Sequence, residues 1–263
     1  MTLTTYEVLA LRYATRMTTK SECYLNYHLY GEDDAEQAMD YFVWLVRSPE
    51  RTIVVDTGFS AAAGVRRSRT MLTEPAKGLR QLGADPGSVP QVVLTHAHYD
   101  HAGNLPQFPS SEIIMAAREY NFWKGPYARR FLFSSPTERE DLDCLSVASD
   151  EGRVTLVSDT QDVAPGVEAI EVGGHTPGQL IVRVATERGP VVLSSDAMHY
   201  YEEVDRDRPF AIVADLAAMY RGFDLLREME RDHGCILVAG HDPLVMDRFP
   251  PAPGCEGWAV RIA

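Results

Sequence analysis

Short apolar runs recur along the chain, and polar or small residues separate them. Continuous apolar runs of this length, bounded by glycine, proline or polar turns, are typical of buried strands. The pattern predicts strands at 42–46, 52–55, 91–94, 112–116, 167–172, 180–184, 190–194 and 236–239. These are too many for one small sheet and are compatible with two sheets.

Helical patterns occur between the apolar runs. A segment that opens at Thr73-Glu74-Pro75 and ends at Leu82-Gly83 has acidic and proline residues at its start and glycine at its stop, which predicts a helix. A longer helix is predicted from 212 to 232, with apolar side chains at three- and four-residue spacing: Leu216, Met219, Tyr220, Phe223, Leu226 and Met229. We interpret that stripe as a core face and not as a binding groove.

Length and composition favour one layered domain. The 263 residues, 45% of them hydrophobic, can bury a sizeable core, and no linker, repeat or low-complexity tract interrupts them. We therefore expect a single α/β domain over residues 1–263.

The net charge and the N-terminal sequence limit which partners and which location we expect for the protein. The formal net charge of −13 argues against a nucleic-acid partner, and the short basic run at 66–69 does not overturn this. No signal peptide or membrane span is evident, so we expect a cytoplasmic protein without a membrane partner. The four cysteines show no metal-site spacing and are expected to be reduced and mostly buried.

One segment concentrates metal-binding side chains. His96, His98, Asp100 and His101 lie within six consecutive positions, directly after an apolar run. Alternate residues of a strand share a face, so His96 and His98 can point at one ion. Asp100 and His101 lie beyond the strand's end and can turn toward a second ion. A polar loop with solvated histidines is the alternative, but four ligand-type side chains in so short a segment favour a metal site.

Three further ligand candidates occur where an apolar run gives way to a turn of small residues. His175 follows the run at 167–172, Asp196 follows the run at 190–194, and His241 follows the run at 236–239. Such strand ends are where α/β proteins place functional loops, so these side chains can converge on one end of the sheet.

The HxHxDH pattern of residues 96–101 resembles that of the metallo-β-lactamase superfamily of metal-dependent hydrolases, and the other motifs match in order. They are Asp56-Thr57-Gly58, Gly174-His175-Thr176-Pro177-Gly178, Ser195-Asp196-Ala197 and Gly240-His241-Asp242-Pro243. The resemblance runs from about Phe42 to Pro243. It implies an α/β fold of the metallo-β-lactamase type, a four-layer αββα sandwich.

The resemblance also implies how the ligands are shared between two divalent metal ions. His96, His98 and His175 would bind the first ion, Asp100, His101 and His241 the second, and Asp196 would bridge them. Five histidines and two aspartates exceed the four positions of a tetrahedral zinc ion but suit two ions with a shared carboxylate. Zn²⁺ is expected first, and Fe, Co or Mn would tolerate the same ligands. Asp56 is interpreted either as a group that holds the histidine loop by hydrogen bonds or as a turn residue.

Such a site is suited to acyl hydrolysis. Two divalent ions about 3.5–4 Å apart hold a bridging hydroxide at neutral pH and polarise a carbonyl group. No separate nucleophile is required, so Ser194 and Ser195 are interpreted as strand-end residues. Asp100 is a candidate to pass a proton to the departing alkoxide as well as to bind a metal ion.

The segment after Asp196 is similar to the Asp-Ala-x-Tyr segment of the N-acyl-homoserine lactonase branch, in which the tyrosine hydroxyl reaches toward the substrate carbonyl. The matching position here is His199, and Tyr200 follows it. His199 is a candidate hydrogen-bond donor to the developing oxyanion, or a structural residue at the strand end, and Tyr200 is the substitute candidate.

The resemblance to this branch implies a quorum-quenching lactonase that takes a small-molecule lactone or ester. A thioesterase or amide hydrolase on the same metal ions is the alternative, followed by a metal-binding protein without turnover. The aromatic segment at 120–133 is compatible with a pocket wall, a homodimer interface or plain packing. Phe59 and Met198, next to site motifs, are better placed than this segment to touch substrate.

Overall fold

Two β-sheets lie face to face in the computed structural model, which describes residues 4–263. The larger sheet has the order β13-β1-β2-β3-β5-β6-β7, with β4 paired to β1. Its strands are β1 (Glu7–Thr19), β2 (Glu36–Arg47), β3 (Thr52–Val55), β4 (Thr70–Met71), β5 (Gln91–Val93), β6 (Glu112–Ala116), β7 (Val154–Val157) and β13 (Ala259–Arg261). The smaller sheet has the order β12-β11-β10-β9-β8. Its strands are β8 (Thr160–Ala164), β9 (Val167–Glu171), β10 (Leu180–Val184), β11 (Val191–Leu193) and β12 (Ile236–Val238).

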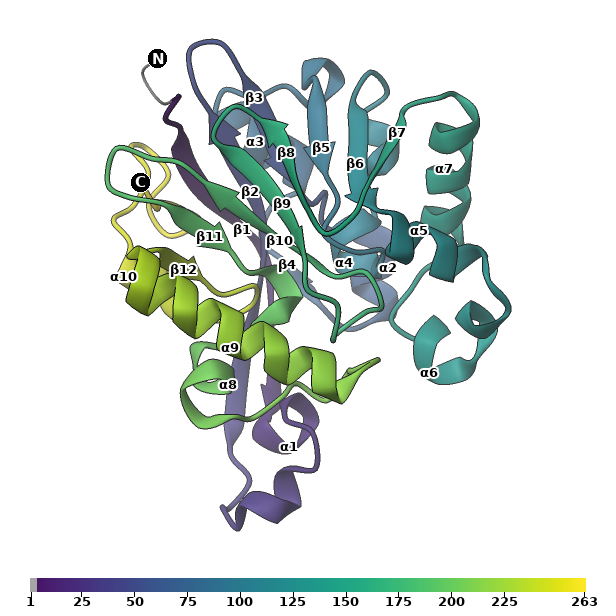
Figure 1. The fold of residues 1–263 in the computed structure, drawn as a ribbon, viewed down its shortest axis with the longest axis vertical. Coiled ribbons are helices and arrows are strands. Elements are labelled where there is room, and N and C mark those ends of the chain that lie inside the picture. The colour runs from purple at the N-terminus through teal and green to yellow at the C-terminus, as the bar shows by residue number, and fades with distance from the viewer. Residues whose placement is uncertain (1–3) are drawn as a thin grey trace.

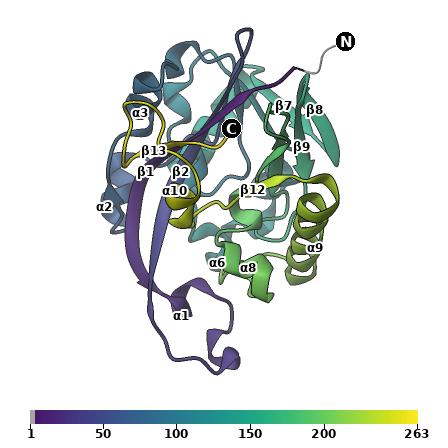
Figure 2. The same ribbon diagram turned by 90° about the vertical axis from the view of Figure 1, so that its left-hand side faces the viewer.

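Helices cover the outer faces of both sheets. The α-helices of the described chain are α1 (Lys20–Cys23), α2 (Ala61–Arg66), α3 (Pro75–Gln81), α4 (Tyr99–Ala102), α5 (Ala117–Lys124), α6 (Phe131–Ser134), α7 (Arg139–Asp150), α8 (Tyr201–Arg206), α9 (Leu216–His233) and α10 (Leu244–Arg248). Figure 2 shows α2 and α3 outside the larger sheet and α9 outside the smaller one, with both sheets between them. The expected four-layer αββα sandwich is confirmed.

The strand β2 shows why the strands appear in the sequence as continuous apolar runs. Phe42, Trp44 and Val46 face the core between the two sheets. Val43 and Leu45 point the other way and pack beneath the helices. A strand with helices on one face and a second sheet on the other is buried on both, so apolar residues fill successive positions.

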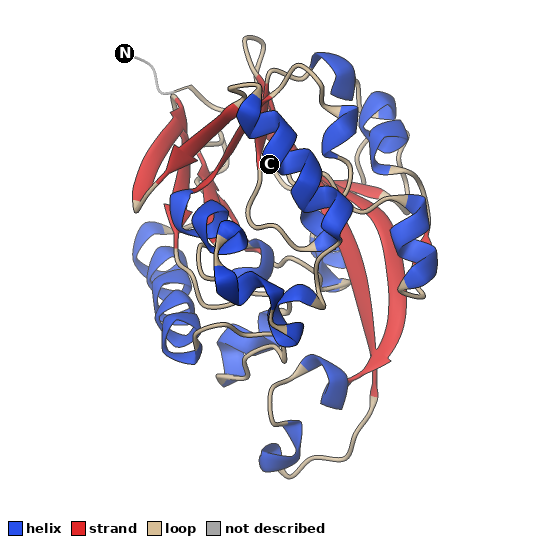
Figure 3. Ribbon diagram, turned by 90° about the vertical axis from the view of Figure 1, so that its right-hand side faces the viewer, coloured by secondary structure: helices blue, strands red, loops and turns tan. Residues whose placement is uncertain are grey.

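The strands β1 and β2 are long and project past the rest of the larger sheet, carrying α1 at their far end (Figures 1 and 3). Their pairing shifts register between Arg12 and Ala14. At this bulge the Tyr13 hydroxyl donates a hydrogen bond of 2.9 Å to the backbone oxygen of Asp100. The irregular strand thus helps to fix the helix that carries part of the expected metal site.

All eight predicted strands are present, with ends that differ by a few residues. The first predicted helix corresponds to α3, and the second, α9, begins at Leu216 because the Asp215 side chain caps it by accepting from the Ala218 amide. The pattern missed β1, β4, β7, β8 and β13.

Two further sequence expectations concern the described chain. All four cysteines are free thiols, and Cys23, Cys235 and Cys255 are buried, as expected. None of the helices in residues 4–263 has both the length and the apolar character needed to cross a membrane.

Candidate metal centre

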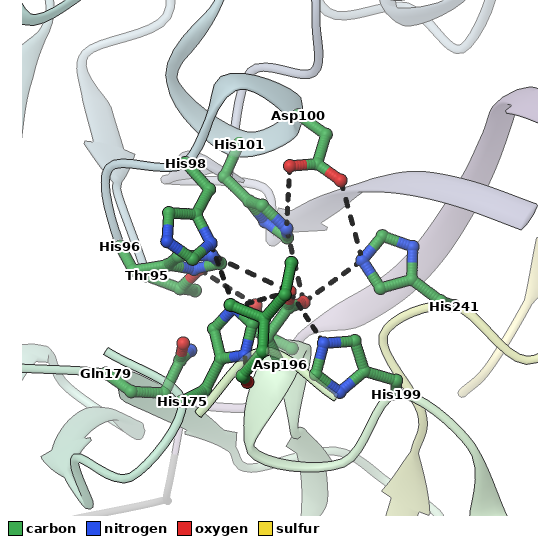
Figure 4. A network of polar contacts seen from close by, with 12 residues as sticks. Thr95, His96, His98, Asp100, His101, His175, Gln179, Asp196, His199 and His241 are labelled. Carbon is green, nitrogen blue, oxygen red and sulfur yellow. Dashed lines mark hydrogen bonds and ion pairs between the residues drawn. The ribbon is translucent and has the colours of Figure 1, made fainter. Parts of the chain in front are cut away.

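Loops from both sheets bring the predicted ligands together (Figure 4). The histidines there come from the ends of β5, β9, β11 and β12 and from α4, and they make up six of the chain's eight: His96, His98, His101, His175, His199 and His241. The donor atoms form two sets, and within each set all of them lie within 4.8 Å of one another. One set is His96, His98, His175 and Asp196, and the other is Asp100, His101 and His241. These are the two sets that the family resemblance implied, with the expected bridging residue Asp196 grouped with the first.

The Asp196 carboxylate lies between the two sets and turns one oxygen toward each. Its Oδ2 atom is 3.2 Å from His175 Nε2 and 3.6 Å from His96 Nε2. Its Oδ1 atom is 3.2 Å from His101 Nε2 and 3.1 Å from His241 Nε2. This is the arrangement required of a carboxylate that bridges two cations.

Unpartnered buried atoms indicate that the centre is built for cations. His96 Nε2, His101 Nε2 and Asp196 Oδ1 are buried, and none makes a hydrogen bond within the described chain. Buried polar atoms without partners are rare, and several that converge on one point are explained when a metal ion binds them. Imidazole and carboxylate donors fit zinc, iron, cobalt or manganese.

The opposite ring nitrogens of three histidines are anchored. His175 Nδ1 lies 2.8 Å from the Ile212 backbone oxygen, and His241 Nδ1 lies 2.8 Å from that of Asp40. His101 Nδ1 lies 2.7 Å from Asp56 Oδ2. Because these acceptors require a proton on Nδ1, Nε2 of each neutral ring carries the lone pair that can bind a metal ion.

Asp56 supports the histidine loop in a second way. Its carboxylate accepts from the Thr95 backbone amide at 2.8 Å and from the Thr95 hydroxyl. Asp56 itself adopts a left-handed backbone conformation with φ of 60°, which is costly for a residue with a side chain. The interpretation of Asp56 as a group that holds the loop by hydrogen bonds is confirmed.

Glu119 is a supporting residue that the sequence analysis missed. Its fully buried carboxylate accepts from the Ala97 amide at 3.1 Å, the Gly178 amide at 2.9 Å and Trp123 Nε1 at 2.7 Å. It therefore ties the loop of the first histidines to the loop of His175. Burial raises its pKa, although these donors oppose the shift. No sequence signal marks it, because one glutamate in an amphipathic helix is ordinary.

Burial sets the protonation of the first ligand set. It lowers the pKa values of His96 and His175 well below the usual range and that of His98 to about 4. The neutral imidazoles that result are the form that binds metal ions. Burial acts on His101 in the same direction, but Asp196 and the other nearby carboxylates raise its pKa overall.

His199 lies against the centre, where the sequence comparison placed it. Its Nε2 atom is 3.1 Å from Asp196 Oδ2, and its Nδ1 atom is 3.3 Å from Glu203 Oε1. The ring stacks on Phe210 with centroids 3.8 Å apart. Burial lowers its pKa, but Asp196 and Glu203 outweigh this and raise it to about 9. Neither ring nitrogen makes a hydrogen bond within the described chain, so the imidazole is a stacked, buried group with free ring nitrogens beside the predicted metal ions.

Tyr200 does not join this group. Its hydroxyl donates to the Ala38 backbone oxygen at 3.2 Å and lies 3.5 Å from Cys23 Sγ. It lines a depression on another part of the surface, with Tyr24 and Arg248. The geometry therefore gives no support to Tyr200 as the substitute catalytic group, because its side chain packs under the β1–β2 projection.

A cavity of about 50 Å³ opens onto the centre. It is lined by His98, Asp100, His175, Asp196, His199 and His241, and by Arg16, Met39, Tyr41, Arg69, Tyr99, Pro136, Phe210 and Ile212. Phe59 and Met198 are not among these residues. Both are buried in the hydrophobic core, so the expectation that they touch substrate is wrong.

Some side chains of the aromatic segment at 120–133 pack inside the protein, and others lie at the surface. The Trp123 ring lies 6.1 Å from that of His98, behind the centre. Phe122, Tyr127 and Phe133 line a separate groove beside Pro177, and Phe131 is exposed. No residue of this segment lines the cavity at the metal centre. Pro136, which follows the segment in sequence, does line it.

A comparison with protein-family models matches residues 39–241 to the metallo-beta-lactamase superfamily. The chain belongs to this superfamily. The match spans every ligand of both predicted sets. This superfamily member is thus a metal-dependent hydrolase with a dinuclear His/Asp site, since both donor sets are complete.

Named relatives of this superfamily member are lactonases at low identity. An N-acyl homoserine lactonase of Bacillus sp is 26% identical over 223 residues, which cover 78% of this chain and 83% of the relative. The N-acyl homoserine lactonase AttM of Azorhizobium caulinodans is 30% identical over 190 residues, or 67% of this chain and 66% of the relative.

The fold is shared with solved structures. One is an N-acyl homoserine lactone hydrolase with the product N-hexanoyl-L-homoserine bound at its catalytic metal centre. It superposes with a TM-score of 0.77 at 20% identity and covers 96% of this chain and 99% of the other. At this identity the likeness establishes the fold.

Proposed function

We propose that the protein hydrolyses a small lactone, adding one water molecule and breaking the ring's acyl–oxygen bond to give a hydroxy acid. The observation that carries the proposal is the Asp196 carboxylate, which turns one oxygen to each of two ligand sets. The lactonase relatives support the choice of a lactone among acyl substrates.

Two divalent ions, zinc first by ligand type, would be held by the two sets and would supply an activated water and a polarised carbonyl. The chain's own residues do the rest. His199 Nε2 donates a hydrogen bond to the carbonyl oxygen as negative charge develops on it. The fixed ring plane, stacked on Phe210, keeps that donor in place.

Asp100 handles the proton. Its carboxylate lines the cavity, with Oδ1 3.9 Å from His101 Nε2 and Oδ2 3.9 Å from His241 Nε2. It takes the proton that the attacking water loses and passes it to the ring oxygen as the acyl–oxygen bond breaks. No proton then has to come from bulk solvent.

The cavity favours a compact substrate. Its volume is about 50 Å³, so a long substituent would extend out past the arginines and Pro136. A small lactone therefore fits this centre better than a bulky ester.

The test is a panel of γ-butyrolactone, N-hexanoyl-homoserine lactone, an acyl thioester and a β-lactam, assayed with the protein loaded with zinc. We expect ring opening of at least one lactone, its loss after chelation and its recovery when zinc is returned. Turnover of the thioester or the β-lactam alone would replace the lactonase assignment. Inactivity on all four with full metal loading would favour a binding protein.

A further inference from the structure

Two arginines at the mouth of the cavity make no ion pair. Arg16, on β1, and Arg69, which follows α2, line it together with the metal-centre side chains. Across residues 4–263, no carboxylate oxygen lies within 4.0 Å of either guanidinium group. Arg16 Nε is buried and has no hydrogen-bond partner.

Arg69 is held in place but keeps donors free. Its Nε atom donates to the Tyr99 hydroxyl at 3.0 Å, and Nη1 donates to the Arg67 backbone oxygen at 2.5 Å. Nη2 has no acceptor of its own in the described chain. The guanidinium also lies over the Tyr41 ring, 5.9 Å from its centroid, so it is a positioned cation in the cavity lining.

The lack of a carboxylate partner sets Arg16 and Arg69 apart from the other partly buried arginines of the described chain. The chain has an excess of carboxylates, with a net charge of −13, and other partly buried arginines use them. Arg12 pairs with Asp40 at 3.1 Å, and Arg208 pairs with Glu202 at 2.8 Å. An unpaired guanidinium beside a cation centre is costly unless an anion from outside completes it.

We propose that the substrate carries a carboxylate and that Arg16 and Arg69 bind it while the lactone carbonyl lies at the metal centre. This proposal rests on the proposed function and names the substrate class more closely, as lactones that carry a carboxylate. A guanidinium fork matches the two oxygens of a carboxylate, and the small cavity suits a compact acid. Addition of one water to such a lactone gives a hydroxy dicarboxylate.

Arg16 is the cleaner position for a test, because it makes no hydrogen bond that holds the fold. The zinc-loaded protein is assayed with γ-butyrolactone and with its 3-carboxylate analogue, and kcat/KM is compared as a ratio. We expect the wild type to prefer the carboxylate and Arg16→Met to reduce that preference about ten-fold or more, mainly through KM. Arg80→Met is the control, since Arg80 is exposed and pairs with Asp85 on the surface.

The control variant removes the same charge and should keep the wild-type ratio. A wild type without preference for the carboxylate, or an Arg16→Met ratio equal to that of the wild type, would overturn the proposal.

Binding separates this proposal from the lactonase assignment. If neither lactone is hydrolysed, glutarate is titrated calorimetrically into the metal-loaded wild type, Arg16→Met and Arg80→Met. Affinity that falls about ten-fold only in Arg16→Met supports the carboxylate site although the lactonase assignment has failed. Equal affinity in all three proteins, or no binding, overturns the carboxylate site as well.

Discussion

His199 Nε2 lies 3.1 Å from Asp196 Oδ2, on the side of the carboxylate that faces His96 and His175. The imidazole therefore sits beside the predicted first metal position and faces the cavity. In this sequence a histidine occupies the place where the lactonase segment it resembles has a tyrosine.

We expect His199→Ala to lower kcat about a hundred-fold or more, because the variant loses the donor to the developing negative charge. Metal content is measured alongside and should stay at two ions per chain. Tyr200→Phe is the matched control and should retain near-normal kcat, since that hydroxyl contacts Ala38 and Cys23 instead. Normal turnover by a fully loaded His199→Ala protein would remove His199 from catalysis.

Asp56→Asn should weaken metal binding about ten- to a hundred-fold. The amide offers one acceptor oxygen where the carboxylate serves both His101 and Thr95, so the His101 ring loses its fixed orientation. Competition with a chromophoric chelator measures the affinity. Asp162→Asn, at an exposed position on β8, should change nothing, and an equal affinity for both variants would contradict the role of Asp56.

Glu119→Ala should destabilise the fold by about 3 kcal/mol or more, because the three donors that Glu119 satisfies become buried without an acceptor. Urea denaturation of the chelator-treated protein measures the free energy of unfolding without a contribution from metal binding. Glu119→Gln keeps one acceptor oxygen and should lose less. Equal losses in the two variants would show that packing, and not hydrogen bonding, sets the effect.

The metal-binding residues of the centre could be predicted from the sequence, whereas the residues that surround them could not. Ligand-type side chains at strand ends are visible as a pattern, because the chain concentrates them beside apolar runs. Glu119, Arg16 and Arg69 are not visible in this way, since their roles arise from contacts between distant segments. Phe59 was misjudged for the same reason: its neighbours in sequence are site residues, but its ring packs on Tyr13, Tyr41 and Tyr99.

The fold shows a similar division. Strands buried on both faces were found, whereas β1 was missed because arginines and threonines interrupt its apolar positions. The edge strand β8 was missed because most of its side chains are exposed, so no apolar run marks it.

Asp141 predicts a pH dependence of stability away from the metal centre. Burial, followed by the charges of Glu138 and Glu140, raises its pKa from 3.8 to about 7. The folded state then holds more protons than the unfolded state between these values, so this group's contribution to stability is lost as pH rises through that window. Asp141→Asn should match the wild type near pH 4 and exceed its melting temperature near pH 8.

Melting temperatures measured across this range check the sign. Asp143→Asn, at an exposed position on the same helix, is the control and should show no such trend. A difference between Asp141→Asn and wild type that does not change with pH would contradict the shift.

The dinuclear centre is tested by a crystal structure of the metal-loaded protein with anomalous data collected at the metal's absorption edge. We expect two peaks on opposite sides of the Asp196 carboxylate, one among His96, His98 and His175 and the other among Asp100, His101 and His241. A single peak, or two peaks that do not share Asp196, would contradict this expectation.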